Sequence, residues 1–180
     1  MSISDDDLKS VLKSLSFAAH KHKDQRRREV EASPYMNHPI TLANILCNEV
    51  HVTDNDVICA ALLHDTVEDT DTTEAELGQE FGSTICGIVM DVTDDKALGK
   101  AERKQLQIEH PANKRDQAKL VKQSDKISTL RDMARFPPAG REHEKRRDKI
   151  DCEKPVNDRL RGLHGQLETI IDYDYSRRTK

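Results

Sequence analysis

The segment ALLHDTVEDT, residues 61–70, places ionisable side chains directly after an apolar run. In a helix, His64 and Glu68 lie one turn apart on a shared face. Asp65 and Asp69 form a second pair with the same spacing. An imidazole nitrogen beside a carboxylate oxygen suits a first-row divalent metal such as manganese or iron, or zinc. Since two protein ligands rarely hold such an ion, we expect further ligands elsewhere in the chain.

Two more residues have the type and setting of metal ligands. His38 lies in PYMNHP, just ahead of a predicted helix, and Asp125 lies in VKQSDKISTL, a polar interruption of an otherwise apolar helix. With the HD pair they supply two imidazoles and two carboxylates. A metal held by these groups lowers the pKa of a bound water toward about 7 and so generates hydroxide at neutral pH. Glu68 and Asp69, one turn further on, are then placed to orient that water or to carry its proton.

Each of these residues also has an ordinary structural interpretation. An HD dipeptide alone is weak evidence, His38 before a proline can cap a helix, and Asp125 can lie on a solvated face. Glu68 and Asp69 can simply frame the turn that follows them. The order of the residues, a histidine, then HD, then an aspartate, all on predicted helices, favours a metal site over these alternatives.

Helices must position these residues, because the sequence shows helical periodicity and lacks the alternation of apolar and polar residues that is typical of strands. Ser4 is expected to cap a first helix, and Asp54 the helix that leads into the HD pair. Thr72 or Thr73, with Glu76 three residues after Thr73, is expected to cap a short fourth helix, which Gly82 and Ser83 end before a fifth helix through ICGIVMDVT. Pro39 lies near the start of the second helix. The first helix is expected to carry one apolar face made of Leu8, Val11, Leu12, Leu15, Phe17 and Ala18.

Further helices are predicted over residues 100–110, 114–134 and 156–172, with a stop at PPAG. Aromatic residues make up only 3% of the chain, so leucine and alanine must do most of the packing. A length of 180 residues suits one domain with a hydrophobic core. We therefore predict a single all-α domain over residues 1–180.

The cysteines and the charge indicate the compartment and the partners. Cys47, Cys59, Cys86 and Cys152 form no CxxC pair, and buried free thiols are typical of a reducing compartment. The acidic N-terminus lacks the apolar run of a signal peptide, and the longest apolar run, VICAALL, is too short to span a membrane. The formal net charge of −4 argues against general attraction to nucleic acid. We expect a cytoplasmic protein with neither a membrane nor a nucleic acid as partner.

The order H, HD, D is typical of HD-domain metal-dependent phosphohydrolases. Four segments resemble the metazoan SpoT-like alarmone hydrolases, small relatives of the hydrolase domain of bacterial RelA/SpoT proteins. They are QRRREVEASPYMNHPITLANIL, AALLHDTVEDTDTTEAELGQEFG, VTDDK and KLVKQSDKISTLRDM. The resemblance covers roughly residues 5–136, and HDTVEDT is specific to the RelA/SpoT branch.

This resemblance implies an all-helical HD domain that binds one manganese ion. The implied reaction removes pyrophosphate from the 3′ position of guanosine tetra- or pentaphosphate, with metal-bound hydroxide attacking the 3′-linked phosphorus. The family's metal ligands match His38, His64, Asp65 and Asp125, and its catalytic pair matches Glu68 and Asp69. The family positions that lie near the nucleotide or near its phosphates match Arg27, Arg28, Tyr35 and Lys100.

The charges of the chain agree with an anionic substrate. An overall acidic protein needs local cations to hold a nucleotide with two diphosphates. Arg26–Arg28 precede His38, and a second basic cluster after VTDD contains Lys96, Lys100, Arg103 and Lys104. Arginine can bind phosphate through two parallel hydrogen bonds and can also stack on a base.

The sequence departs from the family pattern at two places. Thr129 stands where the family has an asparagine after the metal aspartate, so an amide's paired donor and acceptor are lost. Substrate affinity or preference is expected to differ, whereas the metal site is not. Residues 141–155 contain no aromatic residue where the family has several, and Pro155 interrupts any helix there.

Two alternatives to alarmone hydrolysis stay open. The same metal site can serve a phosphatase acting on NADPH or on another ribose-phosphorylated nucleotide. Metazoan members of the family are associated with removing the 2′-phosphate of NADPH. From a different class, the chain can be a non-catalytic HD domain that only binds a nucleotide or a partner. The complete set of ligand and acidic residues argues against that second alternative.

Overall fold

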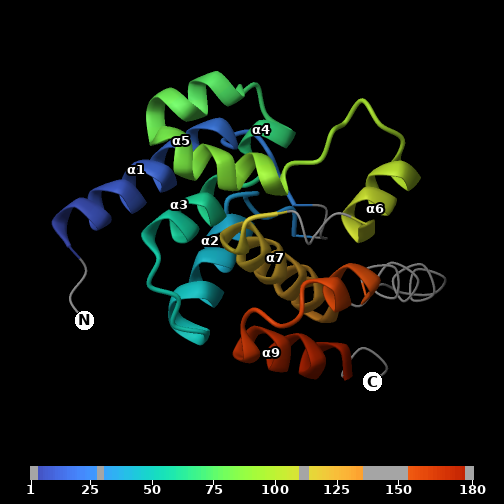
Figure 1. Ribbon diagram of the computed structural model, residues 1–180. Helices are drawn as coiled ribbons and strands as arrows, with labels where there is room; N and C mark the ends of the chain where they lie inside the picture. The colour runs from blue at the N-terminus through green and yellow to red at the C-terminus, as the bar shows by residue number, and fades with distance from the viewer. Residues whose placement is uncertain (1–3, 28–30, 110–113, 136–153, 177–180) are drawn as a thin grey trace. The chain divides into compact units, whose positions relative to one another are not determined.

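The computed structural model describes residues 4–27, 31–109, 114–135 and 154–176, which Figure 1 shows as coloured ribbon. Within these ranges the chain is helical, with an isolated antiparallel bridge between Arg26 and Pro34 and no β-strand. The all-α prediction is therefore confirmed. The chain divides into two compact units, Met1–Ala97 (unit 1) and Leu98–Lys180 (unit 2). The prediction of one domain over residues 1–180 stays a prediction.

Three helices of unit 1 begin at the residues that the sequence predicts as caps. They are α1 (Asp5–Lys21), α3 (Asn55–Leu63) and α5 (Glu74–Val92). The side chains of Ser4, Asp54 and Thr73 accept hydrogen bonds from backbone N–H groups in the respective first turns. These N–H groups have no partner within their helix, so each cap fixes where its helix starts.

The buried face of α1 differs in part from the predicted one, since Ala18 is buried as predicted but Leu8 and Leu12 are not. Ser14 and Ala18 are fully buried, whereas Leu8 and Leu12 are 45% and 53% exposed. The face of α1 toward α3 is thus lined by small side chains, which let two helices approach closely. The apolar pattern alone does not show which of two neighbouring stripes makes this contact.

α3 is the central helix of unit 1 and packs against α1, α2 (Asn37–Asn44) and α5. All its residues from Val57 to Leu63 are buried, so it has no solvated face and its sequence is apolar on every side. The polar residues after Leu63 consequently emerge directly from the core. Figure 1 shows α3 ending next to the short helix α4 (Thr66–Asp69).

α2 continues into one π-helical turn, η1 (Ile45–Glu49). Val50 N–H donates to the Ile45 carbonyl at 3.1 Å, which is the i to i+5 bond of a π-helix. Pro39 is the third residue of α2, where its missing N–H costs no helical hydrogen bond. α2 therefore starts at Asn37, slightly earlier than the sequence predicts, and His38, which was expected just ahead of the helix, is its second residue.

α5 bends at Gly82, where φ is 81° and ψ is 168°. Residues with a Cβ avoid this backbone conformation, so glycine permits the bend. The predicted break at Gly82 is confirmed, as a kink inside α5.

Unit 2 contains α6 (Lys100–Glu109), α7 (Asp116–Arg135) and α9 (Gly165–Ser176). α6 and α7 lie where the sequence predicts helices, but the single helix predicted over residues 156–172 is wrong. A helix covers residues 154–159, a turn covers 160–164, and α9 follows. Gly162 takes a φ of 92° in this turn. The apolar pattern continues across the turn because both helical segments contribute to the same core, through Val156, Leu160, Leu167 and Ile171.

Cys47, Cys59 and Cys86 are free thiols, as predicted, although Cys47 is half-buried and not buried. Burial raises the pKa of both the Cys47 and the Cys59 thiol. Cys152 and most of the divergent segment 141–155 lie outside the described residues. No helix in the described part of the chain has the length and apolar character needed to cross a membrane.

Candidate metal centre

The HD pair occupies a two-residue turn between α3 and α4. His64 follows the last residue of α3, and Asp65 precedes the first residue of α4. The turn is fixed by the Thr66 hydroxyl, which donates to the Leu63 carbonyl at 2.7 Å. The prediction that both residues lie within one helix is therefore wrong in detail. The break lets the two neighbouring side chains turn toward a common point.

His38, His64 and Asp65 each offer a ligand atom, and these atoms all lie within 4.8 Å of one another. Asp65 Oδ2 lies 2.9 Å from His64 Nε2 and 3.9 Å from His38 Nε2. Each imidazole is only 6% exposed. Three of the four predicted ligands thus come together in unit 1, from α2 and from the turn after α3.

The hydrogen bond of His64 indicates which of its nitrogens is available to a metal. His64 Nδ1 lies 2.9 Å from the Ala61 carbonyl oxygen, which can only accept, so Nδ1 carries the hydrogen. In the neutral imidazole, Nε2 then carries the lone pair that can bind a metal, and a backbone carbonyl bonded to the other ring nitrogen is usual for histidines that bind metals. Two imidazoles and one carboxylate around one point fit a divalent cation, which would offset the repulsion between their electron-rich atoms.

Glu68 and Asp69 are held by the segment that follows α5. Glu68 Oε2 accepts a hydrogen bond of 3.2 Å from the Asp94 N–H. Asp69 Oδ1 lies 2.5 Å from Lys96 Nζ. The sequence predicts Lys96 as part of a phosphate-binding cluster, but here it forms an ion pair with Asp69. Both acidic side chains therefore have fixed positions next to the HD turn.

Tyr35 connects the metal group to the acidic pair. Its hydroxyl lies 2.5 Å from Asp65 Oδ2 and 3.3 Å from Asp69 Oδ2. Burial, and then the charge of Asp65, raise the pKa of Tyr35 well above its usual range, so the hydroxyl stays protonated. Sequence reasoning missed this contact, since no spacing rule relates residue 35 to residues 65 and 69.

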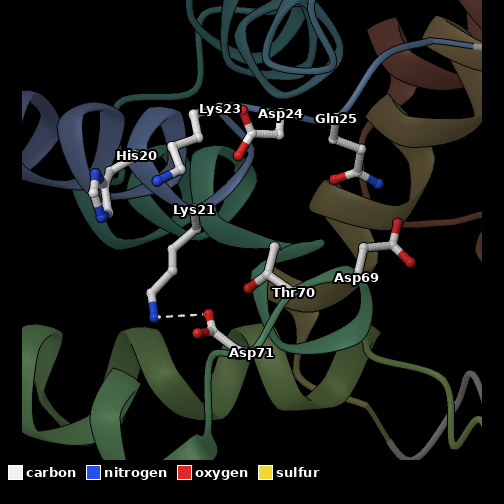
Figure 2. Close-up of a pocket in the computed structure, with 8 residues that line it drawn as sticks. All are labelled: His20, Lys21, Lys23, Asp24, Gln25, Asp69, Thr70 and Asp71. Carbon is white, nitrogen blue, oxygen red and sulfur yellow. Dashed lines mark hydrogen bonds and ion pairs between the residues drawn. The ribbon is translucent and has the colours of Figure 1, made fainter.

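A polar cavity of about 520 Å³ opens beside Asp69, between the end of α1 and residues 69–71. Figure 2 shows Lys21 reaching Asp71, with Asp69 and Gln25 on the other side of the view. His20, Lys23 and Asp24 complete its rim. Asp69 is thus reachable from solvent, whereas the two imidazoles are buried.

Of the remaining predicted site residues, Arg27 lies beside Tyr35 in unit 1, whereas Asp125, Lys100 and Thr129 belong to unit 2. Asp125 lies on α7 in unit 2, where its Oδ1 is 3.5 Å from the Thr129 hydroxyl and its Oδ2 is 3.8 Å from Lys126 Nζ. Lys100 is the first residue of α6. Arg28 lies outside the described residues, and Arg27 places its guanidinium carbon 5.7 Å from the centre of the Tyr35 ring. That Asp125, Lys100 and Thr129 join the site stays a prediction.

Comparison with known families identifies the fold around this group. The family model described as "HD domain" matches residues 14–152. The chain belongs to the HD-domain family. Two curated relatives, both called guanosine-3′,5′-bis(diphosphate) 3′-pyrophosphohydrolase MESH1, come from Danio rerio and Homo sapiens. The first is 48% identical over 158 residues, covering 88% of this chain and 88% of the relative. The second is 44% identical over 168 residues, covering 93% of this chain and 94% of the relative.

A solved structure extends this similarity to the whole chain. It is described as a metazoan ortholog of SpoT that hydrolyses ppGpp and plays a role in starvation responses. It superposes with a TM-score of 0.90 at 42% identity, covering 99% of this chain and 98% of that chain. The resemblance to metazoan SpoT-like HD-domain proteins that the sequence indicates is confirmed.

Proposed function

We propose that this chain is a metal-dependent guanosine-3′,5′-bis(diphosphate) 3′-pyrophosphohydrolase. The observation that carries the proposal is the convergence of His38, His64 and Asp65 within 4.8 Å, with Glu68 and Asp69 one turn away. Relatives that are nearly half identical over most of their length carry that name, which supports the substrate. The nucleotide is the expected small-molecule partner.

We propose Mn²⁺ as the ion and Asp125 as a fourth ligand. The donor set of imidazole and carboxylate suits manganese, iron or zinc, so the donors alone do not select among them. The resemblance to the SpoT-like hydrolases favours manganese. When bound, the ion supplies a water of lowered pKa and offsets phosphate charge.

Glu68 and Asp69 are proposed to manage the protons of the reaction. Hydrolysis forms a bond between the water oxygen and the 3′-linked phosphorus and breaks the bond between that phosphorus and the ribose 3′ oxygen. One proton must leave the water and one must reach the 3′ oxygen. A carboxylate accepts the first, and the same group or its neighbour returns a proton to the leaving oxygen.

We propose that Arg27, Arg28, Lys100 and Thr129 contact the nucleotide, as the resemblance implies. Guanidinium and ammonium groups offset the charge of an anionic substrate, and a hydroxyl can donate to phosphate. We also propose a cytoplasmic location, which the three free thiols of the described residues support.

The test is to incubate the purified protein and Mn²⁺ with guanosine 3′,5′-bis(diphosphate) and, in parallel, with NADPH. We expect pyrophosphate and guanosine diphosphate from the first substrate, at a higher kcat/KM than phosphate release from the second. Faster release of phosphate from NADPH would assign the site to a 2′-phosphatase. No release from the first substrate by protein with bound Mn²⁺ would refute the proposal.

Hydrolysis in ¹⁸O-labelled water tests the point of attack. If water attacks phosphorus, the label appears in pyrophosphate and not in the nucleoside 3′ oxygen. Label in the 3′ oxygen would show cleavage of the carbon–oxygen bond instead and would contradict the proposed roles of Glu68 and Asp69.

A further inference from the structure

The segment that contains Tyr35 pairs through backbone hydrogen bonds with the segment that follows α1. The Tyr35 N–H donates to the Gln25 carbonyl at 3.1 Å, and the Arg27 N–H donates to the Ser33 carbonyl at 2.9 Å. α2 begins two residues after Tyr35. The backbone of Tyr35 is therefore fixed on one side by this pairing and on the other by the start of the helix that carries His38.

The ring of Tyr35 is held as firmly as its backbone. The His22 ring lies 4.8 Å away at an interplanar angle of 31°. His22 is 2% exposed, and its Nδ1 is 2.6 Å from Gln25 Oε1, so the stacked ring is itself anchored. The Tyr35 ring consequently has little freedom to swing toward a ligand.

The hydroxyl at the end of this ring meets two carboxylates that have different roles. The shorter contact, 2.5 Å, is to Asp65 Oδ2, and the longer, 3.3 Å, is to Asp69 Oδ2. A hydroxyl has a single proton, so it donates mainly to Asp65 and holds Asp69 through the weaker contact. One rigid side chain thereby sets the distance between a metal ligand and an acid of the proposed catalytic pair.

We propose that Tyr35 is a positioning residue. It orients Asp65 toward the metal and keeps Asp69 at a fixed distance from Asp65. The proposal rests on the proposed function and changes the role expected for Tyr35, which the resemblance places near the nucleotide. Partners that hydrogen-bond to metal ligands fix the direction of the ligand lone pairs, and their loss typically costs about 10- to 100-fold in metal affinity or activity.

The test compares Tyr35→Phe with the unchanged protein in two separate measurements. Mn²⁺ titration without substrate is expected to give a Kd about 10- to 100-fold higher for the variant. Kinetics at saturating Mn²⁺ are expected to show a lower kcat for guanosine 3′,5′-bis(diphosphate), with KM changed by less than about twofold, because Asp69 keeps its ion pair with Lys96 but loses the contact that fixes its Oδ2. Phenylalanine keeps the ring between its neighbours, so Tm should be unchanged.

Two further variants make the comparison specific to the hydroxyl. Tyr35→Met also lacks it, and the same loss of Mn²⁺ affinity is expected there even if packing changes. Tyr173→Phe removes a hydroxyl from a residue of α9 that is 57% exposed, and it should match the unchanged protein in every measurement.

A raised KM with unchanged Mn²⁺ affinity and kcat would overturn the inference and return Tyr35 to nucleotide binding. A variant with unchanged Mn²⁺ affinity, kcat and KM would overturn the inference as well. Because the Mn²⁺ titration needs no substrate, it tests Tyr35 even if the protein does not hydrolyse this nucleotide. Failure of the inference and failure of the proposed function are therefore distinguishable.

Discussion

The ammonium group of Lys96 lies 2.5 Å from Asp69 Oδ1. Two residues earlier, the Asp94 N–H donates to Glu68 Oε2. The segment after α5 thus holds both members of the acidic pair at once, although it is separated from them by the whole of α5. A short segment of chain can in this way determine where two neighbouring carboxylates point.

Replacing Lys96 should therefore impair turnover more than substrate binding. We expect Lys96→Met to lower kcat by about 10- to 100-fold through displacement of Asp69, with a smaller change in KM. Lys96→Arg keeps the charge and should recover most of the rate. Steady-state kinetics with guanosine 3′,5′-bis(diphosphate) measure both parameters. Lys154→Met removes a similarly exposed ion pair with Asp158 and serves as the control. A change in KM alone would mean that Lys96 binds phosphate.

Glu68→Gln should separate proton transfer from metal binding. The amide oxygen of glutamine can still accept the hydrogen bond from the Asp94 N–H, so the local structure should persist. Loss of a general acid–base group lowers the rate by about 10²- to 10⁴-fold, and Mn²⁺ affinity should stay the same. Kinetics and Mn²⁺ titration of the same preparation test both statements. A fully active variant would show that Glu68 has no catalytic role.

Lys21 links the end of α1 to the turn after the acidic pair. Its Nζ lies 3.0 Å from carboxylate oxygens of both Asp71 and Glu76, and its side chain is only 15% exposed. Lys21→Met should lower Tm by a few degrees near pH 7. Lys9→Met is the matched control, because the Lys9–Asp6 pair is almost fully solvated and should contribute nothing measurable.

This stabilisation should depend on pH in a defined direction. The hydrogen bond with Lys21 lowers the pKa of Asp71, so its contribution exists above the ordinary carboxyl pKa and is lost as pH falls through the folded-state value. Hydrogen bonds with Glu76 and Asp71 raise the pKa of Lys21, whose contribution is lost only as pH rises through that higher value. Thermal melts should show the difference between Lys21→Met and the unchanged protein shrinking below about pH 4. A difference that grows in acid would contradict this.

Gly162 allows the turn before α9. Nothing lies within 4 Å of an added Cβ, so the cost of Gly162→Ala is conformational, and we expect a loss of about 1 to 2 kcal/mol in the free energy of unfolding. Gly165→Ala is the control, since its Cβ also meets open space and its φ is not positive. Denaturant unfolding of the two variants measures the difference. Equal stabilities would mean that the turn tolerates other conformations.

The sequence predicted those features that depend on local rules. Ser4, Asp54 and Thr73 cap helices because a short polar side chain can reach the N–H groups of the next turn. The grouping of His38 with His64 and Asp65 was predicted from residue types and order, and the resemblance to a known family strengthened it.

Features that depend on contacts between distant segments were not predicted. The burial of Ser14 in place of Leu12 depends on which side of α1 meets α3. The ion pair of Lys96 with Asp69 depends on the path of the chain after α5. The contact of Tyr35 with Asp65 depends on the backbone pairing of residues 25–27 with residues 33–35. The end of the helix before Gly162 was missed because the apolar period continues through the turn.

The most direct test of the proposed function is to measure pyrophosphate and guanosine diphosphate from guanosine 3′,5′-bis(diphosphate) for the unchanged protein and His64→Ala. Each should be assayed with added Mn²⁺ and with a chelator. We predict equal amounts of the two products from the unchanged protein with Mn²⁺, none with the chelator, and loss of both Mn²⁺ binding and turnover in His64→Ala. An unchanged protein that binds Mn²⁺ and releases no pyrophosphate, or a His64→Ala variant that is equally active, would contradict the assignment.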